Sequence, residues 1–312
     1  MIISLTLNPA VDKTLVLDEL RVGALNRVSS QKITAGGKGI NVANDLISLG
    51  TETVVAGFVA DKNIDIIRNS VVSLETKGAK AEFVRVDGRN RTNVKIIESS
   101  GRLTEINEPG FEVSAENVNQ LIEKLIKYAT PDNSFVLTGS IPRGVSKAIY
   151  RQISDAMKKN GAKVYIDADG EALKYAVESI PNVIKPNEHE LLEYFGDKSF
   201  SEKTLINRAK EITAKGIETV IVSRGDKGVL FVRNDSVIKC EALSVDTKST
   251  VGAGDAMLAT YVWGVDRGLS YEECIRYSVA ASAYAVTLET PYFTEASEIE
   301  TLINQVVIQK IE

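Results

Sequence analysis

The stretch "STVGAGDAM", residues 249–257, places an acid directly after three small residues and before an apolar run. Gly252, Ala253 and Gly254 leave a backbone that a ligand can approach closely, and the pattern after them predicts a helix. The N–H groups and the positive dipole end of such a helix start favour anions. Asp255 therefore has two interpretations, a helix cap or a general base facing a ligand.

A second glycine cluster, "TAGGKGIN", surrounds Lys38 and opens another predicted helix. It is not a Walker A loop, because Gly39 follows the lysine and the glycine spacing differs. Neither cluster completes the GxGxxG fingerprint, since Val42 and Met257 stand where the third glycine belongs, and this argues against a nicotinamide dehydrogenase. Two helix N-termini that can each bind an anion predict two phosphate-bearing ligands. The alternative is that the two glycine clusters are unrelated tight turns.

A basic stripe occurs in "RNRTNVK", residues 89–95. Arg89, Arg91 and Lys95 alternate with other residues, so on a strand they share one face. In an acidic protein, such a stripe could bind the phosphate of a substrate. The alternative is an edge strand protected by its charges.

Two further motifs follow predicted strands. Asn187 and Glu190 lie three residues apart in "IKPNEHE", where they could hold water on Mg²⁺ or could simply cap a helix. Ser223, Gly225 and Gly228 in "VSRGDKG" come at the carboxyl end of "TVIVS". Open parallel sheets bind their ligands at that end of the strands.

The composition limits the possible function classes. The chain has 312 residues, 44% hydrophobic and 25% charged, with a net charge of −5, so neither nucleic acid nor a membrane is expected as a partner. The one histidine, His189, excludes a multi-histidine metal site, and a surface role on a helix is expected for it. Proton transfer therefore falls to carboxylates. Cys240 and Cys274 form no CxxC, which favours a reduced, cytoplasmic location.

Short β-branched runs alternate with amphipathic segments along the chain. The predicted strands are 2–7, 53–59, 134–139, 163–167, 182–185 and 219–223, and helices are predicted over 114–130, 146–161 and 201–216. This alternation predicts an α/β fold with a mostly parallel central sheet covered by helices on both faces. Residues 12–34 and 81–107 alternate apolar and polar side chains around turns and predict a small antiparallel β lid. We expect one domain, residues 1–312, with this lid.

The order of the motifs along the chain resembles the ribokinase-like family, and more narrowly its phosphofructokinase B branch of phosphosugar kinases. The resemblance runs from "LTLNPAVD" to the C-terminal helices through GGKGIN, TGSIPRG, KPNEHE, SRGDKG and GAGD. It implies a ribokinase-like fold and ATP-dependent phosphorylation of a phosphosugar, with Mg²⁺ accompanying ATP. One departure is Ser249, where many relatives carry an acid.

The resemblance also implies roles for individual positions. Asp255 matches the general base, and the small residues before it, Gly252, Ala253 and Gly254, match the hole that receives phosphoryl charge. The nucleotide and metal positions are Lys185, Asn187, Glu190, Ser223, Gly225, Gly228 and Thr250, with Asn187 and Glu190 acting on the metal through water. The sugar-phosphate positions are Asp12, Gly37, Lys38, Asn41, Arg91 and Arg27.

Within this branch, "RNRTNVK" and "GFEVS" look closer to kinases of fructose 1-phosphate, whereas "GGKGINVA" also suits kinases of tagatose 6-phosphate. We therefore expect conversion of fructose 1-phosphate to fructose 1,6-bisphosphate, with tagatose 6-phosphate or fructose 6-phosphate as alternatives. A non-catalytic sugar-phosphate sensor is the alternative from another class, but such a protein could lose Asp255, Lys38 or Asn187, and all three are present. A homodimer through the lid is also expected.

Overall fold

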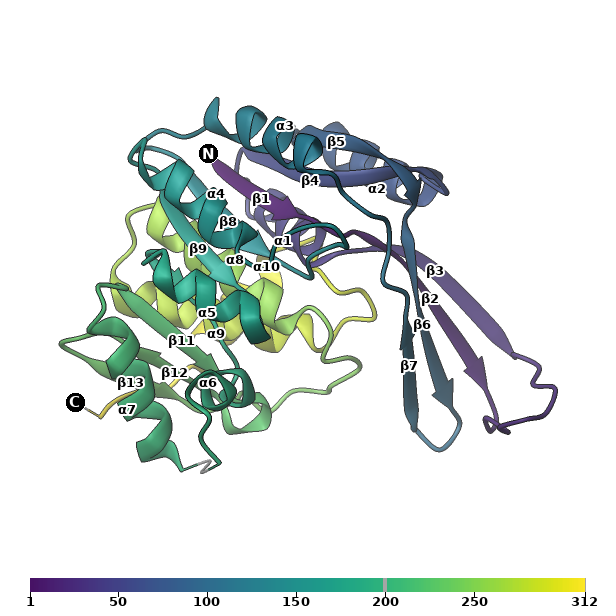
Figure 1. Cartoon of the computed structure of the whole chain (residues 1–312). Coiled ribbons are helices and arrows are strands. Elements are labelled where there is room, and N and C mark those ends of the chain that lie inside the picture. Colours follow the sequence, from purple (N-terminus) through teal and green to yellow (C-terminus); the bar gives the residue numbers. More distant parts are fainter. Residues whose placement is uncertain (199–200, 312) are drawn as a thin grey trace.

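The structure, a computed structural model, describes residues 1–198 and 201–311. Within this part of the chain, the strands form one ten-stranded sheet and one four-stranded sheet. Figure 1 shows the small sheet projecting from the side of the main body. None of the described helices is long and apolar enough to cross a membrane.

The large sheet carries the predicted parallel core. Its order is β14 (Ile308–Lys310), β13 (Val237–Cys240), β12 (Val229–Val232), β11 (Thr219–Ser223), β10 (Val183–Ile184), β9 (Lys163–Asp167), β8 (Ser134–Thr138), β1 (Ile2–Thr6), β4 (Thr53–Lys62) and β5 (Lys80–Arg89). Neighbouring strands from β11 to β5 pair in parallel, and β12 to β14 add antiparallel pairs at one edge. All six strands predicted from β-branched runs are present.

Helices cover both faces of this sheet, as predicted. They are α1 (Lys38–Ser48), α2 (Asp65–Thr76), α3 (Ala115–Ile126), α4 (Ile149–Lys158), α5 (Gly170–Glu178), α6 (Glu188–Phe195), α7 (Glu202–Thr213), α8 (Ala253–Asp266), α9 (Tyr271–Ala285) and α10 (Ser297–Ile303). Alternate strand residues point to opposite layers: Ile3 and Leu5 pack with α3 to α7, whereas Ile2 packs with α1, α8, α9 and α10. This two-residue alternation puts these two clusters on opposite faces of the sheet, and a third cluster packs α2 against α1 and β4.

The small sheet differs from the predicted lid in two respects. It has the order β3 (Ser30–Gly36), β2 (Ala10–Leu17), β6 (Arg91–Glu98) and β7 (Leu103–Asn107). Its outer pairs are antiparallel, but the central pair, β2 and β6, is parallel. Residues 81–89 do not belong to the lid, because β5 pairs in parallel with β4 at the edge of the large sheet. We call the four-stranded sheet the lid sheet.

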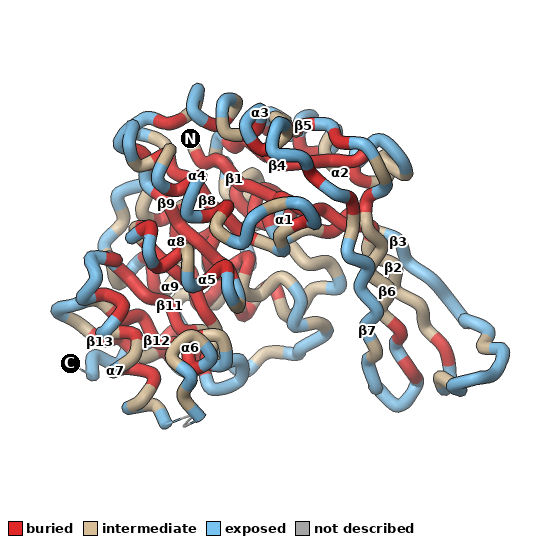
Figure 2. The backbone as a smooth tube through the Cα atoms, in the orientation of Figure 1, coloured by how far each residue is buried: buried red, intermediate tan, exposed pale blue. Residues whose placement is uncertain are grey.

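The lid sheet is much less buried than the large sheet. Figure 2 shows the strands of the large sheet mostly as buried, whereas those of the lid sheet are mainly intermediate or exposed. The connection between β2 and β3 forms the far tip of the lid sheet in Figure 1.

Candidate active site

The candidate site lies where parallel strands end. Asp167 is the last residue of β9, Lys185 and Asn187 follow β10, and Ser223 ends β11. Because these strands are parallel neighbours, their carboxyl ends meet at one edge of the sheet. The N-terminus of α8 and the lid sheet complete the walls of the cavities found there.

Asp255 lies in the first turn of α8 but does not cap the helix. The N-cap is Gly252, with φ of 91°, and a Cβ there would lie 2.0 Å from the carbonyl oxygen of Pro291. The Asp255 carboxylate instead accepts a hydrogen bond at its Oδ2 from Asn41 Nδ2, 2.8 Å away. Asp255 is therefore held toward α1, and it lines a cavity instead of capping the helix.

Burial controls the protonation of Asp255. The residue is 5% exposed, and this burial raises the pKa of its carboxyl to about 6, against the opposing attraction of Lys38. A carboxylate with this pKa is ionised at neutral pH and is a better proton acceptor than an ordinary aspartate.

Asp167 is a site residue that the sequence analysis missed. Its Oδ2 lies 3.0 Å from Lys38 Nζ, and its Oδ1 lies 3.4 Å from Lys185 Nζ. Burial alone would raise the pKa of Asp167, but the two ammonium groups overcome it and hold the pKa at about 2. The sequence could have indicated Asp167, because the predicted strand "KVYID" ends in this acid. Ligands bind at the edge of the sheet where parallel strands have their carboxyl ends.

The two lysines carry positive charge toward different parts of the site. Asp167 raises the pKa of Lys38 well above its usual value, although 46% of that side chain faces open space. Lys185 is 5% exposed, and its Nζ would lie 3.0 Å from a Cβ placed at Gly254. One buried carboxylate thus orients one ammonium beside the start of α8 and another beside the start of α1.

Asn187 and Glu190 form a capping box at the start of α6. Asn187 Oδ1 accepts from the Glu190 backbone N–H, and Glu190 Oε2 accepts from the Asn187 backbone N–H, both at 2.8 Å. Glu190 Oε1 lies outside this pair, and burial raises the pKa of the carboxyl. The cap interpretation therefore holds for both residues, and it leaves one carboxylate oxygen for a metal-bound water.

Asn187 and Glu190 fit a loosely held divalent metal. Within residues 1–198 and 201–311, no cluster of three or more His, Cys, Asp or Glu side chains could hold a metal by itself. Mg²⁺ needs few protein ligands, because it keeps several waters and binds the phosphates of its nucleotide. A single carboxylate oxygen of Glu190 in the wall of a cavity suits that mode of binding.

Two large adjoining cavities lie at the site, and a smaller one of about 200 Å³ opens beside the second. The first, about 600 Å³, has an apolar part that includes Leu243, Met257 and Val279. The second, about 410 Å³, is polar and lies between the lid sheet and α8, with Asp255 in its wall. They share the lining residues Ser223, Thr250 and Gly254. Gly225 and Gly228 line the first cavity, and Asp12, Gly37, Lys38, Asn41, Arg91, Lys185, Asn187 and Glu190 line the second.

The lid sheet supplies charge to the polar cavity. Arg91, Asn93 and Lys95 share one face of β6, and all three line the cavity. Arg91 Nε donates to the carbonyl oxygen of Asn8 at 3.1 Å, and burial lowers the pKa of its guanidinium, opposed by Asp12. Asp12 Oδ1 accepts from Asn93 Nδ2 at 2.9 Å. Arg91 is thus held by the connection between β1 and β2, and Asn93 is held by Asp12 on the neighbouring strand β2.

Some residues singled out from the sequence lie elsewhere. Arg27 is exposed in the connection at the lid tip and lines neither cavity, so within one chain the structure does not bring it to the site. The lid is long enough to carry this connection away from the large sheet. Arg89 ends β5 in the large sheet and also lines neither cavity, which corrects the predicted three-residue stripe. His189 is exposed on α6, as expected.

Comparison with known proteins gives the family. Residues 5–296 match the pfkB family carbohydrate kinases. The chain belongs to this family. A 1-phosphofructokinase of Haemophilus influenzae is 33% identical over 312 residues, which is all of this chain and 99% of that protein. That of Vibrio cholerae is 31% identical over 310 residues, 99% of this chain and 97% of that protein.

Solved structures agree with this assignment. Phosphofructokinase-2 from Escherichia coli in complex with fructose-6-phosphate has a TM-score of 0.87 and 25% identity, over 97% of this chain and 98% of that chain. This pfkB family member is thus an ATP-dependent sugar-phosphate kinase of the phosphofructokinase type, with the ribokinase-like fold expected from the sequence. ATP with a divalent metal, and a phosphosugar, are its ligands.

Proposed function

We propose that this kinase converts fructose 1-phosphate to fructose 1,6-bisphosphate with Mg-ATP. One observation carries the proposal: a single polar cavity is lined by the cations Arg91 and Lys38 and by the carboxylate Asp255, and it adjoins the larger, partly apolar cavity. A phosphosugar has a phosphate for the cations and a hydroxyl for the carboxylate. The relatives that are 31–33% identical over their full length are named 1-phosphofructokinases, which favours the 1-phosphate.

The residues suggest how the transfer proceeds. Asp255 accepts the proton of the attacking sugar hydroxyl, whose oxygen forms the new bond to the γ-phosphorus while the bond to the bridging oxygen of ADP breaks. Backbone N–H groups at Gly252, Ala253 and Gly254 stabilise the charge of the transferring group. Lys185 lies beside Gly254, where its ammonium group can stabilise the negative charge of the transferring phosphoryl group.

The remaining residues bind and orient the two ligands. Asp12 and Asn41 hold sugar hydroxyls, with Gly37 allowing close approach, while Ser223, Gly225, Gly228 and Thr250 line the nucleotide side. Mg²⁺ would be held through water by Glu190 and Asn187, where it would neutralise phosphate charge. Asp167 keeps both lysines in place. Two buried, unpaired cysteines suit the proposed cytoplasmic location.

A substrate panel tests the proposal. Release of ADP at saturating Mg-ATP gives kcat/KM for fructose 1-phosphate, fructose 6-phosphate and tagatose 6-phosphate. The highest value is expected for fructose 1-phosphate, with weaker activity on the 6-phosphates, because the ends of these ketoses are similar. The structural likeness to phosphofructokinase-2 with bound fructose-6-phosphate makes that sugar the second candidate. A higher value for either 6-phosphate would overturn the substrate assignment and leave kinase activity intact.

We also propose a homodimer through the lid sheet. Apolar side chains are exposed on both of its faces: Ile33 and Ile106 lie in one cross-strand row, and Ile97 pairs with Leu103 on the opposite face. Exposed apolar area on the lid sheet favours a protein partner. Light scattering should give twice the chain mass for the wild type and a smaller mass for Leu103→Asp. A monomeric wild type at micromolar concentration would contradict the proposal.

A further inference from the structure

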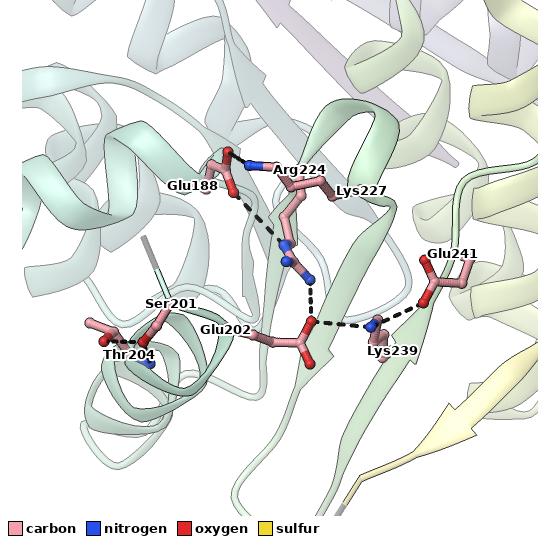
Figure 3. Close-up of polar contacts among 8 residues, drawn as sticks. All are labelled: Glu188, Ser201, Glu202, Thr204, Arg224, Lys227, Lys239 and Glu241. Atoms are coloured by element: carbon pink, nitrogen blue, oxygen red, sulfur yellow. Dashed lines mark hydrogen bonds and ion pairs between the residues drawn. The ribbon is translucent and has the colours of Figure 1, made fainter. Parts of the chain in front are cut away.

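A connected set of charged side chains lies beside the loop that borders the first cavity, of about 600 Å³. We call this the nucleotide cavity, because the proposed function assigns the nucleotide to it. The loop comprises η1 (Gly225–Lys227) and Gly228, and it follows β11. Arg224 precedes it with 8% of its side chain exposed, and Glu188, the first residue of α6, has 10% exposed. Figure 3 shows these two side chains approaching each other from different elements.

One carboxylate binds Lys227 at the end of η1 and lies within ion-pair distance of Arg224, which precedes η1. Glu188 Oε1 accepts a hydrogen bond from Lys227 Nζ at 3.0 Å, and Glu188 Oε2 lies 3.8 Å from Arg224 Nε. The backbone N–H of Arg224 also donates to the carbonyl oxygen of Gly228 at 2.9 Å, which closes the loop on itself. Glu188 therefore ties the closed loop to the first turn of α6, the turn that carries Glu190.

A second carboxylate extends these contacts to the wall of the nucleotide cavity. Glu202, the first residue of α7, accepts from Arg224 Nη1 at 2.7 Å and lies 3.2 Å from Lys239 Nζ. Lys239 Nζ lies 3.0 Å from Glu241 Oε1, and Glu241 lines the cavity. The dashed lines of Figure 3 follow this path from Glu188 to Glu241.

Folding stability is a weak explanation for such a network. Removing charges from water costs about as much as their attraction returns, so an enclosed ion pair adds little net stability compared with apolar residues of similar size. Its benefit is a fixed geometry, because each charge must stay where its partner is. Here the loop and the wall residue Glu241 border the first cavity, and the start of α6 borders the adjoining polar cavity through Glu190.

We propose that Arg224 is a positioning residue for ATP. Through Glu188 and Glu202 it holds Gly225–Gly228 in the position that the nucleotide requires, and it thereby sets the affinity for ATP without touching the sugar phosphate. This inference rests on the proposed nucleotide role of Gly225 and Gly228, and it is independent of which phosphosugar is used.

The test compares nucleotide binding with sugar-phosphate binding in the full-length chain. Calorimetry with the Mg²⁺ complex of AMP-PNP should show Kd at least about fivefold higher in Arg224→Met, with the KM for the sugar phosphate within twofold of the wild type. Arg224→Lys, which keeps the charge, should recover part of the affinity. Arg208→Met is the matched control, because Arg208 pairs with Asp197 and Glu211 on and beside α7.

Two further variants separate positioning from folding. If Arg224 acts through Glu188, the double variant Glu188→Gln/Arg224→Met should bind the nucleotide about as weakly as Arg224→Met alone. Lys227 has 54% of its side chain exposed, so Lys227→Met should fold normally and bind the nucleotide about threefold more weakly.

Three results would overturn the inference. In the first, Arg224→Met and Lys227→Met bind AMP-PNP within twofold of the wild type. In the second, Arg208→Met loses as much affinity as Arg224→Met. In the third, the KM for the sugar phosphate rises in parallel with the nucleotide Kd. A wild type that does not bind AMP-PNP would instead overturn the nucleotide role of the cavity, and this inference with it.

Discussion

At the scale of single residues, Arg91 separates binding of the two ligands. Arg91 lines the polar cavity and not the larger, partly apolar cavity. Arg91→Ala should raise the KM for the sugar phosphate by about 10- to 100-fold, because a charge-assisted hydrogen bond contributes about 1.5–3 kcal/mol. The KM for ATP should change by less than twofold. Steady-state kinetics with each ligand varied in turn measures both, and equal changes in the two constants would leave Arg91 with a structural role in the lid sheet only.

The acid limb of the pH profile reports on Asp255. Because burial raises the pKa of this carboxyl to about 6, kcat/KM for the sugar phosphate should fall about tenfold per pH unit below pH 6. The second ionisation of a phosphate monoester also lies near pH 6. The Kd of the sugar phosphate in Asp255→Asn, measured over the same pH range, corrects for that titration. A corrected profile that stays flat down to pH 5 would contradict the assignment.

At the scale of elements, one residue joins the large sheet to the lid sheet. Asn90 lies between β5 and β6 and is fully buried. Its Oδ1 accepts from the backbone N–H of Ala60 at 2.9 Å, and its Nδ2 donates to the carbonyl oxygens of Ala60 at 2.9 Å and Lys62 at 3.2 Å. The carboxamide thus replaces strand pairing at the β-bulge where β4 ends, immediately before Arg91.

Asn90→Ala should loosen this junction. Leaving buried backbone groups unpaired should lower the free energy of unfolding by about 2–4 kcal/mol. Because Arg91 follows directly, the KM for the sugar phosphate should rise more than the KM for ATP. Urea unfolding and steady-state kinetics measure the two effects. Asn26→Ala, in the exposed lid tip, should change neither quantity, and a larger effect on ATP than on the sugar phosphate would contradict the role of the junction.

The same junction shows what the sequence could predict. Strand and helix periodicity gave the large sheet and its two helix layers, because buried parallel strands are nearly continuous apolar runs. It failed at residues 81–89, because β5 is the edge strand of the large sheet and alternates as a lid strand does. Asp167 was missed because it stands next to no glycine motif, and its importance comes from Lys38 and Lys185, distant in sequence.

At the scale of the whole molecule, the raised pKa of Asp255 implies a cost in stability. The folded state holds a proton on this carboxyl up to about pH 6, whereas its usual value is 3.8. Stability is therefore lost as the pH rises from about 4 to 6, by about 3 kcal/mol for two pKa units. Asp255→Asn has no carboxyl at this position, so its free energy of unfolding should not fall through this titration.

Urea unfolding of Asp255→Asn and the wild type at pH 4, 6 and 8 tests that cost. The variant should be about 1–3 kcal/mol more stable than the wild type at pH 8, and the difference should vanish near pH 4. A variant that is less stable at pH 8 would show that the ionised carboxylate contributes to folding instead of opposing it.

Turnover of Asp255→Asn is the most direct test of whether Asp255 is the general base. With Mg-ATP and fructose 1-phosphate, release of ADP by the wild type is compared with release by the variant, and the Kd for the Mg²⁺ complex of AMP-PNP is measured for both. If Asp255 is the general base, kcat should fall at least about a hundredfold, because removal of a general base costs about 10²–10⁴-fold, while nucleotide binding should stay within twofold. Near-normal turnover in Asp255→Asn would contradict this role.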